Sequence, residues 1–140
     1  MYCYKYPHPA VTADCIVFNK EDDKISVLLI KRKNEPYKDC WAFPGGFINI
    51  DESAEEAAIR ELREETGLEI SKIEQLKAYS GPDRDPRERV ITIAFMAESK
   101  IKEVKGSDDA KEAKWFDISD LPPLAFDHEL IMKDALSKIR

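Results

Sequence analysis

Short apolar runs, separated by polar segments, predict a chain built mostly from strands. Runs rich in aliphatic, β-branched and aromatic side chains occur at residues 10–18, 25–31, 73–79, 90–97 and 113–118. Such composition is typical of strands, and the short polar segment 19–24 between the first two predicts a hairpin. The sequence Pro44-Gly45-Gly46 predicts a sharp turn at which the backbone can come close to a ligand.

Two further segments carry the end signals of helices. Ser53 followed by Glu56 is a capping-box pair, and Gly67 suits a left-handed C-cap. Asp127 is expected to cap a final helix that continues to about Lys138. Several strands with one helix in the middle and one at the end predict a mixed α/β fold of the α+β type. Because no repeat or linker interrupts this order, we expect a single domain over residues 1–140.

Composition narrows the class of protein. The chain has 140 residues, of which 43% are hydrophobic and 36% charged, which is typical of a soluble globular protein. The longest apolar run, 27–30, is too short to span a membrane, and no secretion signal is recognised at the start. A net charge of −6 argues against nucleic-acid binding. Three cysteines without a CxxC pair argue against disulfides and structural zinc, so we expect a cytoplasmic protein.

A cluster of carboxylates on the first predicted helix is the candidate site for chemistry. Glu61, Glu64 and Glu65 stand at i, i+3 and i+4, so a helix projects them from one face. Three like charges this close destabilise a helix, and a divalent cation would compensate them. A charge run is usually a solvated surface, but the glycine turn before this helix and Gly67 after it favour a metal site. The backbone carbonyl of Gly46 is a candidate for a further oxygen ligand.

Two charged residues beside this cluster have expected structural roles. Arg60 lies four residues from both Glu56 and Glu64, so we expect it to pair with them and orient a ligand instead of binding substrate. Glu52 precedes the helix and is expected to stabilise the loop or the helix start, because carboxylates favour that end of the helix dipole.

The same stretch resembles the signature of the Nudix hydrolases. Gly46, five residues, Glu52, seven residues and then Arg-Glu-apolar-any-Glu-Glu-any-Gly-apolar match it over residues 46–68 without departure. The resemblance implies a mixed sheet between helices, with the catalytic loop–helix–loop in the middle of the chain. It also implies Mg²⁺-dependent or Mn²⁺-dependent hydrolysis of a nucleoside diphosphate linked to another moiety. The residues it implies are Glu61, Glu64 and Arg60 for catalysis, and Gly46, Glu61, Glu64 and Glu65 for the metal.

The general base stays open at this point. We call the matching residues 46–68 the box. In this family the base lies either on the helix of the box or on a loop that approaches from elsewhere. Glu61 is the candidate on the helix, whereas Asp108, Asp109 and Glu112 are the candidates on a loop. An ordinary polar turn before a strand explains these loop residues equally well.

Arginines outside the box are the candidates for substrate contacts. The loop 80–89 contains three arginines, and we expect Arg84 and Arg87 to bind phosphate, because guanidinium groups make bidentate phosphate contacts. The alternative is a surface loop in which arginines pair with its own residues Asp83, Asp85 and Glu88. Arg32 follows the second strand and is either a phosphate or ribose contact or an exposed strand end.

Aromatic residues near the glycine turn are candidates for stacking on a nucleobase. Tyr37, Trp41 and Phe43 qualify by position, and we assign this role to Phe43. Aromatics in such places are more often core, so we expect only one of them to touch a ligand. His8 and His128 have no metal partners at ligand spacing, and His128 is expected to belong to the start of the last helix.

The loop and the segment before the box further resemble the Nudix enzymes that act on ADP-ribose. The position of Pro82, the phrase DRDPR followed by VIT, and WAFPGGF carry this resemblance. It implies cleavage of ADP-ribose to AMP and ribose 5-phosphate with magnesium, by a homodimer.

Two other functions compete with this one. One is a Nudix hydrolase that clears oxidised nucleoside triphosphates such as 8-oxo-dGTP with the same box. The other is a non-catalytic domain that senses NAD metabolites, because DRDPR and LAFDHELI also resemble the Nudix domains of transcriptional regulators. Those regulators append a winged-helix domain, for which we expect no room in 140 residues, and their boxes are degraded whereas this one is intact.

Overall fold

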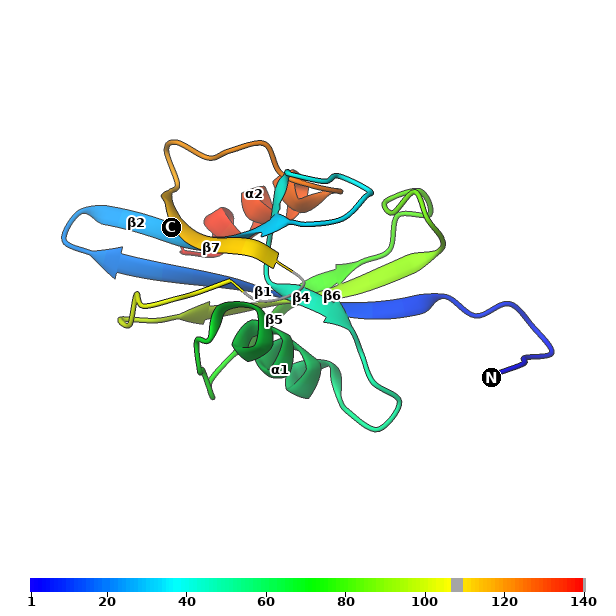
Figure 1. Cartoon of the computed structure of the whole chain (residues 1–140). Helices are drawn as coiled ribbons and strands as arrows, with labels where there is room; N and C mark the ends of the chain where they lie inside the picture. Colours follow the sequence, from blue (N-terminus) through cyan, green and yellow to red (C-terminus); the bar gives the residue numbers. More distant parts are fainter. Residues whose placement is uncertain (107–109, 140) are drawn as a thin grey trace.

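The computed structural model describes residues 1–106 and 110–139, and the predictions for Asp108 and Asp109 therefore lie outside the described residues. The elements in chain order (Figure 1) are β1 (Ala10–Glu21), β2 (Lys24–Arg32), β3 (Trp41–Ala42), β4 (Gly45–Phe47), α1 (Ala54–Thr66), β5 (Glu74–Tyr79), β6 (Val90–Glu98), β7 (Ala110–Asp117) and α2 (His128–Ile139). Within the described ranges, no helix is long and apolar enough to cross a membrane.

The strands form one mixed sheet around the long strand β1. The order is β3-β2-β1-β6-β5, with β4 paired to β1 and β7 paired to β2. Strand β6 runs parallel to β1, whereas β2 and β4 are antiparallel to it. Strand β4 pairs with residues 12–14 of β1 and β2 with residues 18–21. This change of partner brings the segment 44–47 against residues 12–15 of β1, beside the cavity described below.

Each face of the sheet is covered by one helix (Figure 1). Because side chains alternate along a strand, Ala13, Cys15 and Val17 of β1 pack in one buried cluster with Leu62 of α1. Alternate residues of β1, such as Ile16, pack in a second cluster with residues of α2. Burial of apolar side chains on both faces holds the helices to the sheet. The mixed sheet between helices that the resemblance implied is therefore confirmed.

The expected helix ends are also confirmed. The Ser53 hydroxyl accepts from the Glu56 amide, and the Glu56 carboxylate accepts from the Ser53 amide, which completes the capping box. Gly67 has φ +77° and closes α1 with a hydrogen bond from its amide to the Arg63 carbonyl. Helix α2 begins at His128, immediately after Asp127, but the Asp127 carboxylate is bound by Arg84, so its role as a helix cap stays a prediction.

The chain bends at Pro44, between β3 and β4, but the unusual backbone angles expected of Gly45 and Gly46 are not found. Gly45–Phe47 is the strand β4, and neither glycine has a positive φ. At both positions there is little space for a side chain. A Cβ on Gly45 would collide with the Ala13 carbonyl of β1, and one on Gly46 would lie 2.6 Å from the Glu61 carboxyl carbon. The glycines therefore allow a close approach of β1 and α1 to this strand.

Candidate functional site

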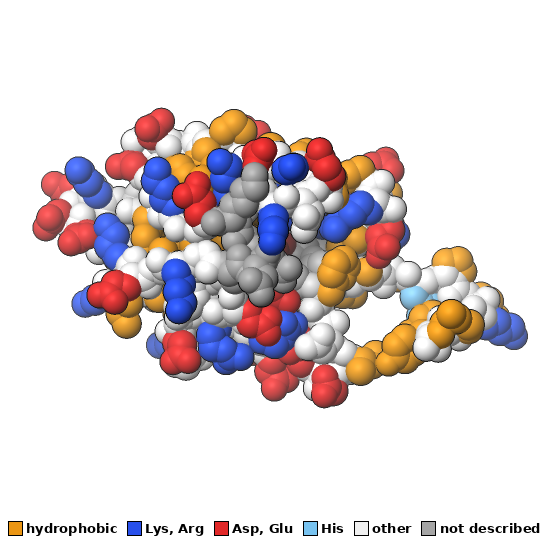
Figure 2. Space-filling view, in the orientation of Figure 1, with side chains coloured by type: hydrophobic (Ala, Val, Ile, Leu, Met, Phe, Trp, Pro, Cys, Tyr) orange, Lys and Arg blue, Asp and Glu red, His pale blue; other side chains and the backbone are white. Residues whose placement is uncertain are grey.

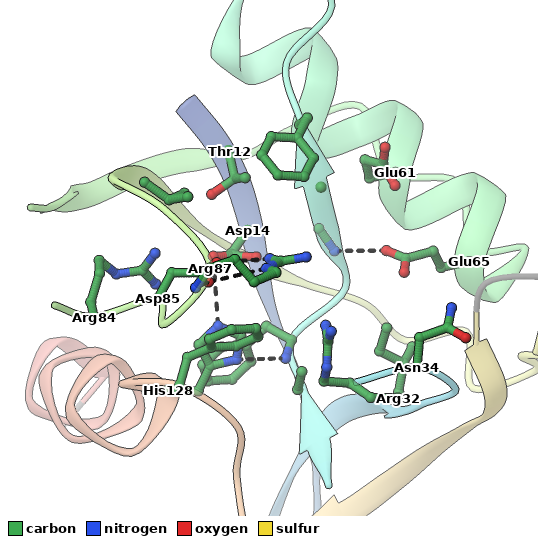
Figure 3. A pocket seen from close by; sticks show the side chains of 18 of the residues that line it. Thr12, Asp14, Arg32, Asn34, Glu61, Glu65, Arg84, Asp85, Arg87 and His128 are labelled. Atoms are coloured by element: carbon green, nitrogen blue, oxygen red, sulfur yellow. Dashed lines mark hydrogen bonds and ion pairs between the residues drawn. The ribbon is translucent and has the colours of Figure 1, made fainter. Parts of the chain in front are cut away.

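A cavity of about 460 Å³ lies where β1, β4, α1, the loop 80–89 and the start of α2 meet (Figure 3). One wall carries the carboxylates Glu61 and Glu65 of α1. Arginines from other elements also line the cavity, among them Arg32 at the end of β2 and Arg87 in the loop. The box and the loop that were expected to act together are thus brought to one cavity.

The two carboxylates of α1 are held by contact with β4. Glu65 is buried, and its Oε1 accepts a hydrogen bond of 2.7 Å from the Gly45 amide. The Glu61 carboxyl group lies so close to Gly46 that a Cβ there would displace it. Charge-assisted bonds of this kind fix a carboxylate in place, and the glycine pair therefore aims both groups at the cavity.

Arg60 organises the remaining charges at the start of the box. It donates to Glu52 through Nε and Nη2, the shortest bond being 2.6 Å, and through Nη1 to Glu61 at 2.8 Å and Glu64 at 3.1 Å. The Arg60 hydrogen bond, and a further one from the Asn49 amide, lower the pKa of Glu52 to about 2. This confirms the structural role expected for Glu52.

The expected pairing of Arg60 with Glu56 is wrong. The Glu56 carboxylate turns back to accept from the Ser53 amide in the capping box, so it is not directed along the helix toward Arg60. The predicted pairing with Glu64 is confirmed.

The arginines of the loop 80–89 are engaged by carboxylates. Arg87 donates to Asp85 from Nε at 3.1 Å and from Nη2 at 2.7 Å, so pairing within the loop is confirmed for this residue. Arg84 instead reaches Asp127, before α2, with bonds of 2.9 and 2.7 Å. Both arginines border the cavity, but the Arg84 side chain is only 5% exposed, whereas that of Arg87 is 43% exposed.

Arg32 is part of the cavity wall, and its interpretation as an exposed strand end is wrong. Its Nε donates to the Pro36 carbonyl at 2.8 Å, and its guanidinium lies 4.8 Å from the centre of the Phe126 ring. Arg87 lies 5.7 Å from the same ring. Burial, and then repulsion by Arg87, lower the pKa of Arg32. Phe126 therefore holds two like charges at the cavity, and it does so with an unusual φ of +52°.

The aromatic candidates mostly serve as core. Phe43 is 2% exposed, borders the cavity and packs its ring 5.0 Å from the His128 ring. Trp41 packs edge-on against Phe116, and Tyr37 packs against Phe126. The expectation that aromatics here are usually core therefore describes Phe43 and Trp41 well, and a ligand contact of Phe43 stays a prediction.

Sequence reasoning missed two buried polar residues of the cavity, Asp14 and His128. Asp14 of β1 accepts a 2.6 Å hydrogen bond from the Thr92 hydroxyl. His128, the first residue of α2, accepts at Nδ1 from the Phe43 amide, and its Nε2 lies 3.8 Å from Asp14 Oδ2. The signal for Asp14 was an acid within the apolar run 10–18, because a buried charge needs a reason.

The family follows from comparison with known proteins. A family model for the NUDIX domain matches residues 8–137. The chain belongs to the NUDIX family. This NUDIX chain is 55% identical over 130 residues to an ADP-ribose pyrophosphatase of Methanocaldococcus jannaschii, a match that covers 92% of the chain and 74% of that protein.

Solved NUDIX structures share its fold. The NUDIX domain of Shewanella oneidensis NrtR complexed with ADP ribose has a TM-score of 0.90 and 31% identity, covering 96% of this chain and 91% of that one. A bifunctional NMN adenylyltransferase/ADP ribose pyrophosphatase from Francisella tularensis, complexed with AMP and Mn ion, has a TM-score of 0.82 and 29% identity. That match covers 96% of this chain and 43% of the larger protein.

The donor set of this NUDIX chain fits a hard divalent cation in its chemistry. Glu61 and Glu65 present carboxylate oxygens at the cavity, and oxygen is the ligand that Mg²⁺ and Mn²⁺ prefer. Glu64 differs, because its side chain is 53% exposed and pairs with Arg60 away from the cavity wall. Within residues 1–106 and 110–139, no three His, Cys, Asp or Glu side chains are gathered closely enough to hold a metal. Glu61 and Glu65 are thus the better placed of the three expected carboxylate ligands.

Two candidates for the general base can be compared. Glu61 borders the cavity. Glu112 is exposed on β7, opposite Lys31 of β2, and does not border it. The geometry therefore favours Glu61 over Glu112.

Proposed function

We propose that this NUDIX chain hydrolyses ADP-ribose to AMP and ribose 5-phosphate with a divalent cation, Mg²⁺ or Mn²⁺. The observation that carries the proposal is the meeting of box carboxylates and arginines at one cavity. A diphosphate needs both, because its charge must be neutralised while water attacks phosphorus. The identity to a protein named ADP-ribose pyrophosphatase supports the choice of substrate.

The roles of the side chains follow from their positions. Glu61 and Glu65 would hold the cation, which when bound polarises the diphosphate and makes a water nucleophilic. Arg32 and Arg87 would bind the diphosphate. In the described part of the chain, the terminal nitrogens of Arg32 and the Nη1 of Arg87 make no hydrogen bond to protein, so they are available to phosphate oxygens. Glu61 is also the proposed base.

A substrate panel with product identification tests this function. ADP-ribose, 8-oxo-dGTP and the common nucleoside triphosphates would be incubated with the protein and either Mg²⁺, Mn²⁺ or a chelator. We expect kcat/KM for ADP-ribose to exceed that for every triphosphate, with AMP and ribose 5-phosphate as products and no turnover in chelator. Faster cleavage of 8-oxo-dGTP would replace this proposal with the nucleotide-clearing function.

A second candidate is binding of ADP-ribose without turnover. Two observations favour it: the NrtR domain of similar fold is complexed with ADP ribose, and Glu64 stands away from the cavity. Calorimetry and turnover on the same sample separate the two functions. Tight binding without product, unchanged by Glu64→Gln and Glu65→Gln, would establish a sensor.

The expected homodimer and the cytoplasmic location stay predictions. The N-terminal segment projects from the body with apolar side chains along it (Figure 2), and Tyr2, Tyr4 and Tyr6 are 57–74% exposed. Exposed apolar residues of this kind favour a protein contact. Sedimentation of the full chain and of Tyr2→Ser/Tyr4→Ser would show whether this segment holds two copies together.

A further inference from the structure

Asp14 and His128 face each other at the floor of the cavity (Figure 3). Asp14 is 7% exposed and His128 is 4% exposed, so both have lost most of their contact with water. The distance between Asp14 Oδ2 and His128 Nε2 is 3.8 Å. This is too long for a direct hydrogen bond. These two polar groups therefore border the cavity without a direct hydrogen bond to each other.

The backbone fixes which atom of His128 can donate. Nδ1 accepts a 3.1 Å hydrogen bond from the Phe43 amide, so the neutral ring carries its proton on Nε2. Burial, which lowers the pKa of His128, keeps the ring neutral. The Phe43 ring also packs against the imidazole. The cavity thus contains one N–H donor on a ring that is held in place beside Asp14.

Asp14 is equally constrained as an acceptor. The Thr92 hydroxyl donates to its Oδ2 at 2.6 Å. Its Oδ1 lies against the backbone of Gly45, where any Cβ would collide with it. Donor and acceptor are therefore both held before a ligand arrives, which is how a binding site becomes selective.

A hydroxyl group on the cavity side of these two atoms, in contact with both, suits them better than other ligand groups do. An oxygen about 2.8 Å from each atom could accept from His128 Nε2–H and donate to the Asp14 carboxylate. A phosphate oxygen has no proton to donate and is repelled by Asp14. An apolar group would offer His128 Nε2–H no acceptor and Asp14 no further donor.

We propose that Asp14 and His128 form a hydroxyl-binding subsite that recognises one ribose hydroxyl of the substrate. This inference rests on the proposed function, because it deepens the account of how ADP-ribose is bound. It assigns sugar recognition to β1 and α2, apart from the carboxylates of α1 and the exposed arginines.

The first test uses the unaltered protein. A set of ADP-ribose analogues, each lacking one hydroxyl of one ribose ring, would be compared with ADP-ribose. We expect one analogue to lose at least about a hundredfold in kcat/KM, since sites built to bind a hydroxyl reject ligands that lack it by large factors. If every analogue stays within threefold of ADP-ribose, the subsite does not exist and only water occupies it.

The second test shows that these two residues cause the discrimination. His128→Asn removes the Nε2 donor but offers an oxygen to the Phe43 amide, and Asp14→Ala removes the acceptor. In either variant the hundredfold ratio should fall below tenfold. Asn34→Ala, which alters a cavity residue in another wall, should keep the ratio. An unchanged ratio in both test variants would overturn the assignment.

The same ratio can be measured as a Kd by calorimetry in chelator. This separates the two proposals. If the protein does not turn over ADP-ribose but its Kd still differs between ADP-ribose and the analogue, only the hydrolase function is refuted. If turnover is normal and the two Kd values are equal, only the hydroxyl subsite is refuted.

Discussion

Arg84 donates two hydrogen bonds to the carboxylate of Asp127, one of 2.9 Å from Nε and one of 2.7 Å from Nη2. This pair joins the loop 80–89 to the start of α2, and the residue that follows Asp127 is His128. The Arg84 side chain is nearly buried. Its fork geometry suits a carboxylate as well as a phosphate. Arg84 therefore positions the His128 side of the cavity, and its substrate role stays a prediction.

Arg84→Ala should destabilise the fold. The change leaves the Asp127 carboxylate, which is 21% exposed, without its partner. Removing one partner of a mostly buried ion pair costs about 3 kcal/mol. Urea unfolding monitored by circular dichroism would measure this loss. Arg89→Ala is the matched control, because Arg89 is exposed and makes one long bond of 3.3 Å to the Gly81 carbonyl. Equal losses in the two variants would contradict this role of Arg84.

Glu65→Gln should abolish most activity while keeping the fold. A glutamine oxygen can still accept from the Gly45 amide, so the contact between α1 and β4 is retained. The lost charge weakens binding of the metal ion, and we therefore expect kcat to fall by about a hundredfold or more. Glu55→Gln on the exposed side of the same helix controls for a simple change in charge. A loss below tenfold would mean that Glu65 is not a ligand.

The two glycines of β4 should respond differently to alanine. In Gly45→Ala the new Cβ meets the Ala13 carbonyl, which is backbone and cannot move, so we expect a loss of about 3 kcal/mol in stability. In Gly46→Ala the Cβ meets the Glu61 carboxyl group, a flexible end that can swing away. Stability should then fall by only about 1 kcal/mol.

Among the molecules that fold, activity should fall more in Gly46→Ala than in Gly45→Ala. Displacing Glu61 in Gly46→Ala removes a proposed ligand, so kcat should drop and the Mg²⁺ or Mn²⁺ concentration for half activity should rise. Thermal unfolding and metal titration of both variants would measure the two effects. A fully active Gly46→Ala would refute the placement of Glu61.

Local signals could be read from the sequence, whereas long-range contacts could not. Ser53 and Gly67 were predicted correctly because a capping box and a C-cap depend on neighbouring residues. The reason for Gly45 was predicted wrongly, because the need for glycine comes from β1, which is distant in sequence. His128 was assigned only to a helix start, since its partner Phe43 lies 85 residues away. Periodicity predicts which face a residue takes but not which residue it meets there.

The stability of the protein should fall as pH decreases below about 6.5 because of His128. Burial lowers the pKa of His128 in the native state, with Arg84 and Arg32 acting in the same direction and Asp14 and Asp127 against it. The unfolded chain then binds the proton more readily, with a pKa near 6.5. By linkage, stability is fully present above that pH and is lost as pH falls through the native pKa.

This dependence can be measured by urea unfolding at several pH values between 7.5 and about 5. His128→Asn should flatten the slope in this range. His8→Asn, at an exposed position, is the control for loss of a histidine. An equal slope in the native chain and His128→Asn would show that the ring does not titrate differently on folding.

Phe126 and Arg32 should be coupled in substrate binding. The ring lies 4.8 Å from the Arg32 guanidinium and 5.7 Å from that of Arg87, so its π face offsets the repulsion between them. Phe126→Leu removes this support and should raise KM for ADP-ribose about three- to tenfold, with kcat less affected, since a cation–π contact contributes about 0.5–2 kcal/mol. If the effect acts through Arg32, it should shrink when Arg32 is already glutamine.

A double-mutant cycle on KM therefore decides between positioning and packing. Tyr37→Leu is the matched control, because Tyr37 packs against the Phe126 ring but has no ring contact with either arginine. If Phe126 had only a structural role, its replacement would lower the melting temperature and raise KM equally in both backgrounds.

A comparison of Phe126→Gly with Phe126→Ala adds a second readout, because the positive φ strains alanine but not glycine. The glycine variant should be the more stable of the two and equally poor in binding, which would show that the strained backbone is retained for the ring that it places between the arginines.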